Sequence, residues 1–185
     1  MSLESTSPGS APGASPVAPS AAALARQARR LAQAPAPWLN EEVARRLADK
    51  LGPIRLSPKT WLDWSAHLGG GAALVGQAYP EARRQLAEPH AALGAASMAA
   101  SSAAAPQGWA SRLLGRRPSG PKVWAPVDGG FWPPPPGGVD LVWANMALHT
   151  THDLPGLMAL WHRSLAVDGF FMASGLGPDT ARELR

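Results

Sequence analysis

The residues best suited to chemistry lie between Lys59 and Ala72, where an acid is followed closely by three consecutive glycines. A short run of strand-forming residues contains Asp63, and an apolar, helix-compatible run follows Gly69–Gly71. Glycine lets the backbone approach a ligand, and a helix N-terminus offers free N–H groups. The stretch therefore predicts a strand–turn–helix site for a nucleotide-type ligand, with a plain strand-to-helix turn as the alternative.

Two histidines three residues apart, His149 and His152, are a second candidate for chemistry. No third ligand accompanies them, and the chain has no cysteine, which excludes disulfides, thiolate zinc sites and cysteine nucleophiles. We therefore expect no metal site. We regard His149 as a candidate general base or a residue at the mouth of a binding site.

Composition limits the possible partners of the chain. The net charge is +4 and the pI is about 10.3, but only 16% of the 185 residues are charged, and the arginines occur as scattered pairs. Such pairs are more typical of solvated helix faces than of a nucleic-acid surface, although RNA association stays open. No apolar stretch approaches the roughly 18 residues of a membrane span, and the N-terminus is a poor secretory signal. A cytoplasmic protein is the expectation.

The chain divides into a tail and one domain. Residues 1–21 are rich in Ser, Pro, Ala and Gly and predict a disordered tail. Residues 22–185 predict strands that alternate with helices after two initial helices, the second capped by Asn40. The expected helices are 22–34, 40–51, 72–79, 90–105 and 153–166, and the expected strands are 59–65, 82–88, 122–127, 139–145 and 169–174.

This alternation predicts a parallel sheet with right-handed crossovers. Ligands bind such sheets beyond the carboxyl ends of the strands. The residues at those ends are Ser65–Gly71, Glu88, Asp128, Asn145–His149 and Ser174–Gly177.

The later segments resemble one branch of the class I S-adenosylmethionine-dependent methyltransferases. They are Asp140-Leu-Val-Trp-Ala-Asn-Met-Ala-Leu-His149, Asp153-Leu-Pro155, the run from Trp161 to Met172, and Gly177-Pro-Asp-Thr-Ala-Arg-Glu-Leu-Arg185. The branch is that of the malonyl-carrier-protein O-methyltransferase of biotin synthesis (BioC-like), whose pattern mitochondrial complex I assembly relatives share. The resemblance covers residues 38–185 and is strongest over 139–185. It implies a Rossmann-like α/β sheet of about five parallel strands flanked by helices, lacking the C-terminal hairpin with which the family's sheet continues.

The resemblance also implies a glycine-rich cofactor turn. Asp63 matches the acid at the end of the family's first strand, and the three glycine positions that follow hold Ser65, His67 and Gly69. Side chains at glycine positions restrict φ and occupy space. If the turn is a modified cofactor site, glycine at Ser65 and His67 is expected to raise cofactor affinity.

The resemblance gives three further positions roles in S-adenosylmethionine and substrate binding, and Arg182 is a candidate from its position and charge. Glu88 matches the acid that binds the ribose hydroxyls, Asp128 matches an acid near the adenine, and Asn145 lies at the cofactor and substrate mouth. Arg182 could steer a carboxylate or an acidic acyl carrier protein, with an ordinary helix face as the alternative.

The implied reaction is transfer of the methyl group of S-adenosylmethionine to a carboxylate oxygen, as in a malonyl thioester of biotin biosynthesis. The acceptor would be an acyl carrier protein or a small carboxylate. The alternative function is a catalytically inactive protein of the same fold that acts as a binding or assembly factor.

Overall fold

The computed structural model describes residues 20–104, 122–126, 132–133, 135–151, 153–177 and 179–180. Its centre is a sheet of five parallel strands in the order β3-β2-β1-β4-β5. The strands are β1 (Thr60–Trp64), β2 (Arg83–Ala87), β3 (Lys122–Trp124), β4 (Val139–Ala144) and β5 (Leu165–Ala173). The predicted parallel α/β sheet is confirmed, and its strand order reverses between β1 and β4.

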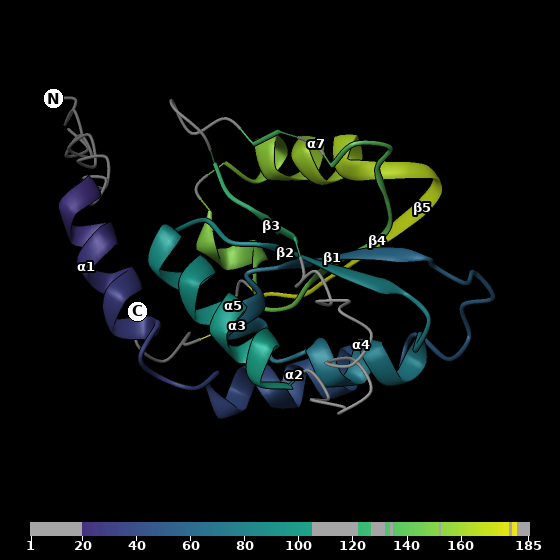
Figure 1. Ribbon diagram of the computed structural model, residues 1–185, viewed down its shortest axis with the longest axis horizontal. Helices are drawn as coiled ribbons and strands as arrows, with labels where there is room; N and C mark the ends of the chain where they lie inside the picture. The colour runs from purple at the N-terminus through teal and green to yellow at the C-terminus, as the bar shows by residue number, and fades with distance from the viewer. Residues whose placement is uncertain are drawn as a thin grey trace, which may run out of the picture.

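Helices cover both faces of the sheet (Figure 1). Helices α2 (Trp38–Ala48) and α4 (Ala72–Ala78) lie on one face, and α7 (Leu154–Ser164) lies on the other. Neighbouring strand residues point to opposite faces, so Trp61 packs in the core with α2 and α4 while Leu62 packs in the core with α7. This two-sided burial explains why β1 and β4 are apolar almost throughout.

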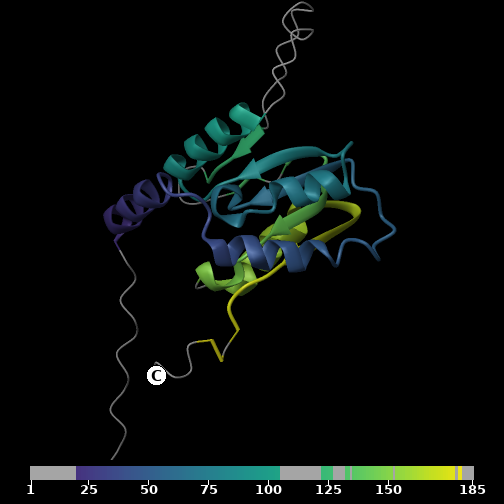
Figure 2. The same ribbon diagram turned by 90° about the horizontal axis from the view of Figure 1, so that it is seen from below.

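Two helices extend the layers beyond the sheet. Helix α1 (Ala21–Leu31) packs beside α5 (Ala91–Ala104), and Figure 2 shows the pair at one end of the molecule. None of the helices in the described part of the chain is long and apolar enough to cross a membrane.

Three local predictions are wrong. Asn40 does not cap α2, which begins at Trp38 directly after Pro37, and its side chain donates instead to the backbone oxygen of Leu68. A short helix, α3 (Ala66–Gly69), occupies part of the expected glycine turn. Strand β5 begins at Leu165, because its pairing with β4 continues across an irregularity in which Asp168 has φ 63°.

Several sequence predictions concern residues outside the described part of the chain. These are nearly all of the tail at 1–21, the last residue of the expected strand 122–127, and Asp128.

The glycine before α4 lies against the largest buried side chain of β4. A Cβ on Gly71 would lie 2.7 Å from Cε2 of the Trp143 indole and closer still to Nε1, while Trp143 is fully buried. Because buried rings have little room to shift, this contact fixes how closely α4 approaches the sheet.

Gly71→Ala is therefore expected to lower the free energy of unfolding by about 1–3 kcal/mol through overpacking. Urea denaturation would measure it. Gly76→Ala is the matched control, because Gly76 lies in the same helix with no atom near its missing Cβ, and it should stabilise the chain by up to about 1 kcal/mol. Equal effects of the two substitutions would contradict the contact with Trp143.

Candidate functional site

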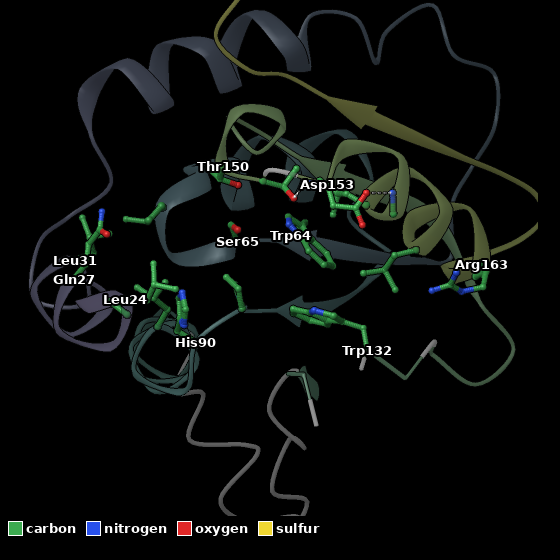
Figure 3. Close-up of a pocket in the computed structure, with 18 residues that line it drawn as sticks. Leu24, Gln27, Leu31, Trp64, Ser65, His90, Trp132, Thr150, Asp153 and Arg163 are labelled. Carbon is green, nitrogen blue, oxygen red and sulfur yellow. Dashed lines mark hydrogen bonds between the residues drawn. The ribbon is translucent and has the colours of Figure 1, made fainter. Parts of the chain in front are cut away.

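A cavity of about 640 Å³ opens at the carboxyl end of β1 (Figure 3). Its walls come from α1, from the turn after β1, from the residues after β2, and from α7 with the 3₁₀ turn η2 before it (Leu148–Thr150). The residues of these walls that line the cavity include Leu24, Leu31, Ser65, Leu68, Pro89, His90, Thr150, Asp153 and Leu157. The cavity thus lies where parallel α/β sheets receive their ligands.

Two tryptophans form part of the cavity wall. The Trp64 and Trp132 rings have centroids 4.5 Å apart, and Trp161 packs edge-on against Trp64 at 5.8 Å. Trp161 is fully buried, so this cluster joins the cavity to the core beneath α7.

In the turn after β1, Ser65 has a backbone conformation that is typical of glycine. Ser65 has φ 53° and ψ 48°, the left-handed region that non-glycine residues rarely adopt. Its N–H donates to the Ala87 oxygen at 2.8 Å, and its own carbonyl accepts from Gly69 N at 2.9 Å. These bonds hold the turn although the serine strains it.

Glu88 follows β2 as a buried carboxylate with one free oxygen. Its Oε1 accepts hydrogen bonds from the backbone N–H of His67, at 2.7 Å, and from the Ser97 hydroxyl. Among the described residues Oε2 has no hydrogen-bond partner, and Glu88 is 0% exposed. Burial raises the pKa of Glu88, although the bonds from Ser97 and His67 oppose that rise.

The next two residues, Pro89 and His90, line the cavity. Glu88 does not itself line the cavity, but it directly precedes two residues that do, and an unpaired carboxylate oxygen is a hydrogen-bond acceptor.

Asp63 is also fully buried. Its Oδ2 accepts from Arg84 Nη2 at 2.6 Å and Nε at 2.9 Å, whereas Oδ1 has no partner in the described part of the chain. Burial raises the pKa of Asp63, and the Arg84 charge offsets part of that rise. Since Arg84 neutralises the acid from β2, Asp63 links the two central strands at the edge that holds the cavity.

Asn145 follows β4 and uses its whole amide group within the protein. Its Nδ2 donates to the carbonyls of Gly69, at 2.6 Å, and Asn40, at 2.7 Å, while its Oδ1 accepts from the Ser174 hydroxyl. Asn145 thereby fixes the turn after β1 to α2 and β5. Direct contact of Asn145 with a cofactor stays a prediction.

The remaining predicted residues lie farther out or outside the described chain. His149 is exposed, and its Nδ1 accepts from Leu176 N at 3.4 Å; its neighbour Thr150 lines the cavity, but His149 does not. Asp128, His152 and Arg182 lie outside the described residues. Across the residues that are described, no three His, Asp or Glu side chains gather as a metal site.

The sequence does not single out Ser97, and it does not predict the hydrogen bond from the Asn40 side chain to the Leu68 carbonyl. Ser97 lies in an Ala/Ser-rich helix, where no pattern marks one serine as buried. Ser174 carries a signal, because it is the first polar residue after a strand and falls at the carboxyl edge of the sheet.

The strand order, the turn after β1 and the acid after β2 form a Rossmann-like α/β sheet that is consistent with the class I methyltransferase fold. Comparison with curated proteins gives a more specific result, since this chain is similar to malonyl-acyl-carrier-protein O-methyltransferases. It is 37% identical to the one from Laribacter hongkongensis over 147 residues, and 33% identical to the one from Gallionella capsiferriformans over 147 residues. It is 32% identical to the one from Methylovorus over 151 residues.

The predicted resemblance to BioC-like methyltransferases is confirmed by these relatives. Each match covers 80% of this chain but only 47–48% of the relative, so the chain spans about half the length of the curated relatives it matches. No family model matches the chain.

Ser65→Gly is expected to stabilise the fold. A serine in the left-handed region costs about 1–2 kcal/mol, and glycine gives back about 0.5–1 kcal/mol of that gain through its greater freedom when unfolded. The net gain should lie between zero and about 1.5 kcal/mol in urea denaturation. Ser65→Ala keeps the strain and should show no gain, so an equal gain from both would refute the strain.

Glu88→Gln is expected to change how stability depends on pH. With its pKa raised in the folded state, Glu88 makes the parent less stable as pH rises from near its usual value of 4.5 through the raised value. Glutamine keeps an oxygen for His67 N–H and Ser97 but cannot ionise. The free energy of unfolding of the variant should therefore increase relative to that of the parent as pH rises. The increase should be about 1.4 kcal/mol for each pH unit that separates the folded from the unfolded pKa of Glu88. Parallel pH profiles of the free energy of unfolding would contradict a raised pKa.

Proposed function

We propose that this chain binds S-adenosylmethionine and transfers its methyl group to the free carboxylate of a malonyl thioester. The observation that carries the proposal is the unpaired Oε2 of buried Glu88, beside a cavity at the carboxyl end of β1. The similarity to malonyl-acyl-carrier-protein O-methyltransferases supports the choice of reaction.

The residues present suit this cofactor. A carboxylate with one free oxygen can accept hydrogen bonds from ribose hydroxyls, and a buried oxygen without a partner is costly unless a ligand or water satisfies it. The turn from Ser65 to Gly69 would hold the part of the cofactor next to the ribose, with Asp63 and Asn145 behind it. We propose Asp128 for the adenine, as the resemblance implies.

When bound, S-adenosylmethionine supplies an electrophilic methyl group on a positively charged sulfur. A malonyl carboxylate is already anionic, so its oxygen needs no base to remove a proton, and exposed His149 is not required as one. Holding the two reactants in line would supply most of the rate. Trp64, Leu157 and Leu160 give the cavity an apolar wall that limits water around the reacting atoms.

The methyl acceptor would reach the cavity from the side of η2 and α7. Thr150 and Asp153 line that side, and Arg182 is proposed to steer the carboxylate or the acyl carrier protein that presents it.

Binding of S-adenosylhomocysteine, the demethylated product, is expected to raise the stability of the parent chain by about 2.7 kcal/mol at a free concentration of about 100 times Kd. Glu88→Gln should weaken this binding at least about tenfold, because a hydrogen bond to a charged group contributes about 1.5–3 kcal/mol. Isothermal titration and thermal unfolding measure both effects. Glu81→Gln, which alters an exposed acid before β2, should leave them unchanged.

The reaction itself is tested with a malonyl thioester and, for contrast, an acetyl thioester without the free carboxylate. Methyl transfer to the first alone supports the proposal. A parent chain that S-adenosylmethionine and its product both fail to stabilise at millimolar concentration would overturn it and favour a non-catalytic binding role.

A further inference from the structure

His67 occupies the second glycine position of the turn, yet its backbone does not need glycine. The described non-glycine residues with positive φ are Ser65, Met146 and Asp168, so His67 has an ordinary conformation. Its side chain is therefore not a source of backbone strain, and its contacts decide what it does.

The imidazole reaches the C-terminal end of α1. Its Nε2 lies 3.1 Å from the Leu31 carbonyl oxygen and 3.1 Å from the Ala34 carbonyl oxygen. Carbonyl oxygens only accept hydrogen bonds, so Nε2 carries a hydrogen and donates. The Leu31 carbonyl also accepts from Ala34 N at 3.1 Å, and Ala34 lies three residues beyond α1. The histidine therefore binds the last residue of α1 and the turn that follows it, where side-chain donors commonly bind helix-end carbonyls.

Helix α1 forms one wall of the cavity. Leu24, Gln27, Ala28 and Leu31 line the cavity, and Figure 3 shows the labelled members of this set at the end opposite Arg163. Among the described elements, α1 packs chiefly against α5, and Ala28 is its buried residue. An 11-residue helix with so small a buried face depends on tertiary contacts to stay in place.

The same residue touches the candidate ribose acid. The backbone N–H of His67 donates to Glu88 Oε1 at 2.7 Å. Side chain and backbone of one residue thus connect the cavity wall formed by α1 to the carboxylate beside that cavity.

We propose that His67 is a positioning residue. Its side-chain hydrogen bonds to the Leu31 and Ala34 carbonyls, called the latch below, hold α1 at the cofactor cavity and fix the position of that wall relative to Glu88. This inference rests on the proposed function, in that the cavity is taken as the cofactor's. It reverses the expectation from the glycine pattern, because replacing His67 by glycine removes the latch and weakens cofactor binding.

The test compares His67→Ala, His67→Gly and His67→Gln with the parent. Amide hydrogen exchange of residues 21–31, measured without ligand, should become about tenfold faster in the alanine and glycine variants, because the latch bonds that hold α1 closed are lost. Affinity for S-adenosylhomocysteine should fall by a similar factor. Glutamine can donate from its amide to the same carbonyls, so His67→Gln should restore much of both properties.

His162→Ala is the matched control, because His162 is an exposed histidine of α7 that does not line the cavity. It should change neither property. Exchange in β2 should also stay unchanged in the His67 variants, since the backbone N–H to Glu88 is present in all of them.

Unchanged exchange of α1 in His67→Ala overturns the latch, whether or not ligand binds. Faster exchange with unchanged affinity overturns its role in cofactor binding, as does higher affinity in His67→Gly. If the parent binds no S-adenosylhomocysteine, the proposed function fails, and the exchange result alone decides whether His67 holds α1.

Discussion

The amide group of Asn145 is the interaction on which the carboxyl edge of the sheet depends. The order of the strands reverses between β1 and β4, and the chain leaves both strands at this edge. Without Asn145, carbonyl groups of the turn after β1 would lose a hydrogen-bond donor. Asn145 supplies two donors to the carbonyls of Asn40 and Gly69, and Ser174 holds its oxygen in place. The turn after β1 is therefore held by α2, β4 and β5, and the cavity above it takes its shape from that arrangement.

Two buried acids next to this turn have different kinds of partner. Asp63 is neutralised by Arg84 and links β1 to β2, whereas Glu88 has only neutral donors; within the described part of the chain, each acid keeps one oxygen without a hydrogen-bond partner. Burying a charge without an ion partner is costly, and proteins keep such groups mainly where a ligand or a reaction uses them. The difference in ion partner is what supports the proposed ligand-binding role of Glu88.

The strands could be predicted from the sequence because apolar runs such as Val139–Ala144 and their glycine and proline boundaries are local signals. The positions of Glu88 and Asn145 at one edge followed from topology, since all parallel strands end on the same side. Their partners did not follow, because the bond from Ser97 and the reach of Asn40 to Leu68 depend on packing between segments far apart in the chain. The contacts of His67 were beyond prediction for the same reason. A side chain at a glycine position suggests obstruction until α1 is seen beside it.

The tryptophan cluster at the cavity gives the protein an intrinsic optical reporter. Trp64 and Trp132 lie close enough for their excited states to couple, and both contribute to the cavity wall. Their emission and near-ultraviolet circular dichroism should therefore respond to a ring or charge placed against them. The chain has eight tryptophans in all, so the circular dichroism of the coupled pair, rather than the total emission, reports events in the cavity without a label.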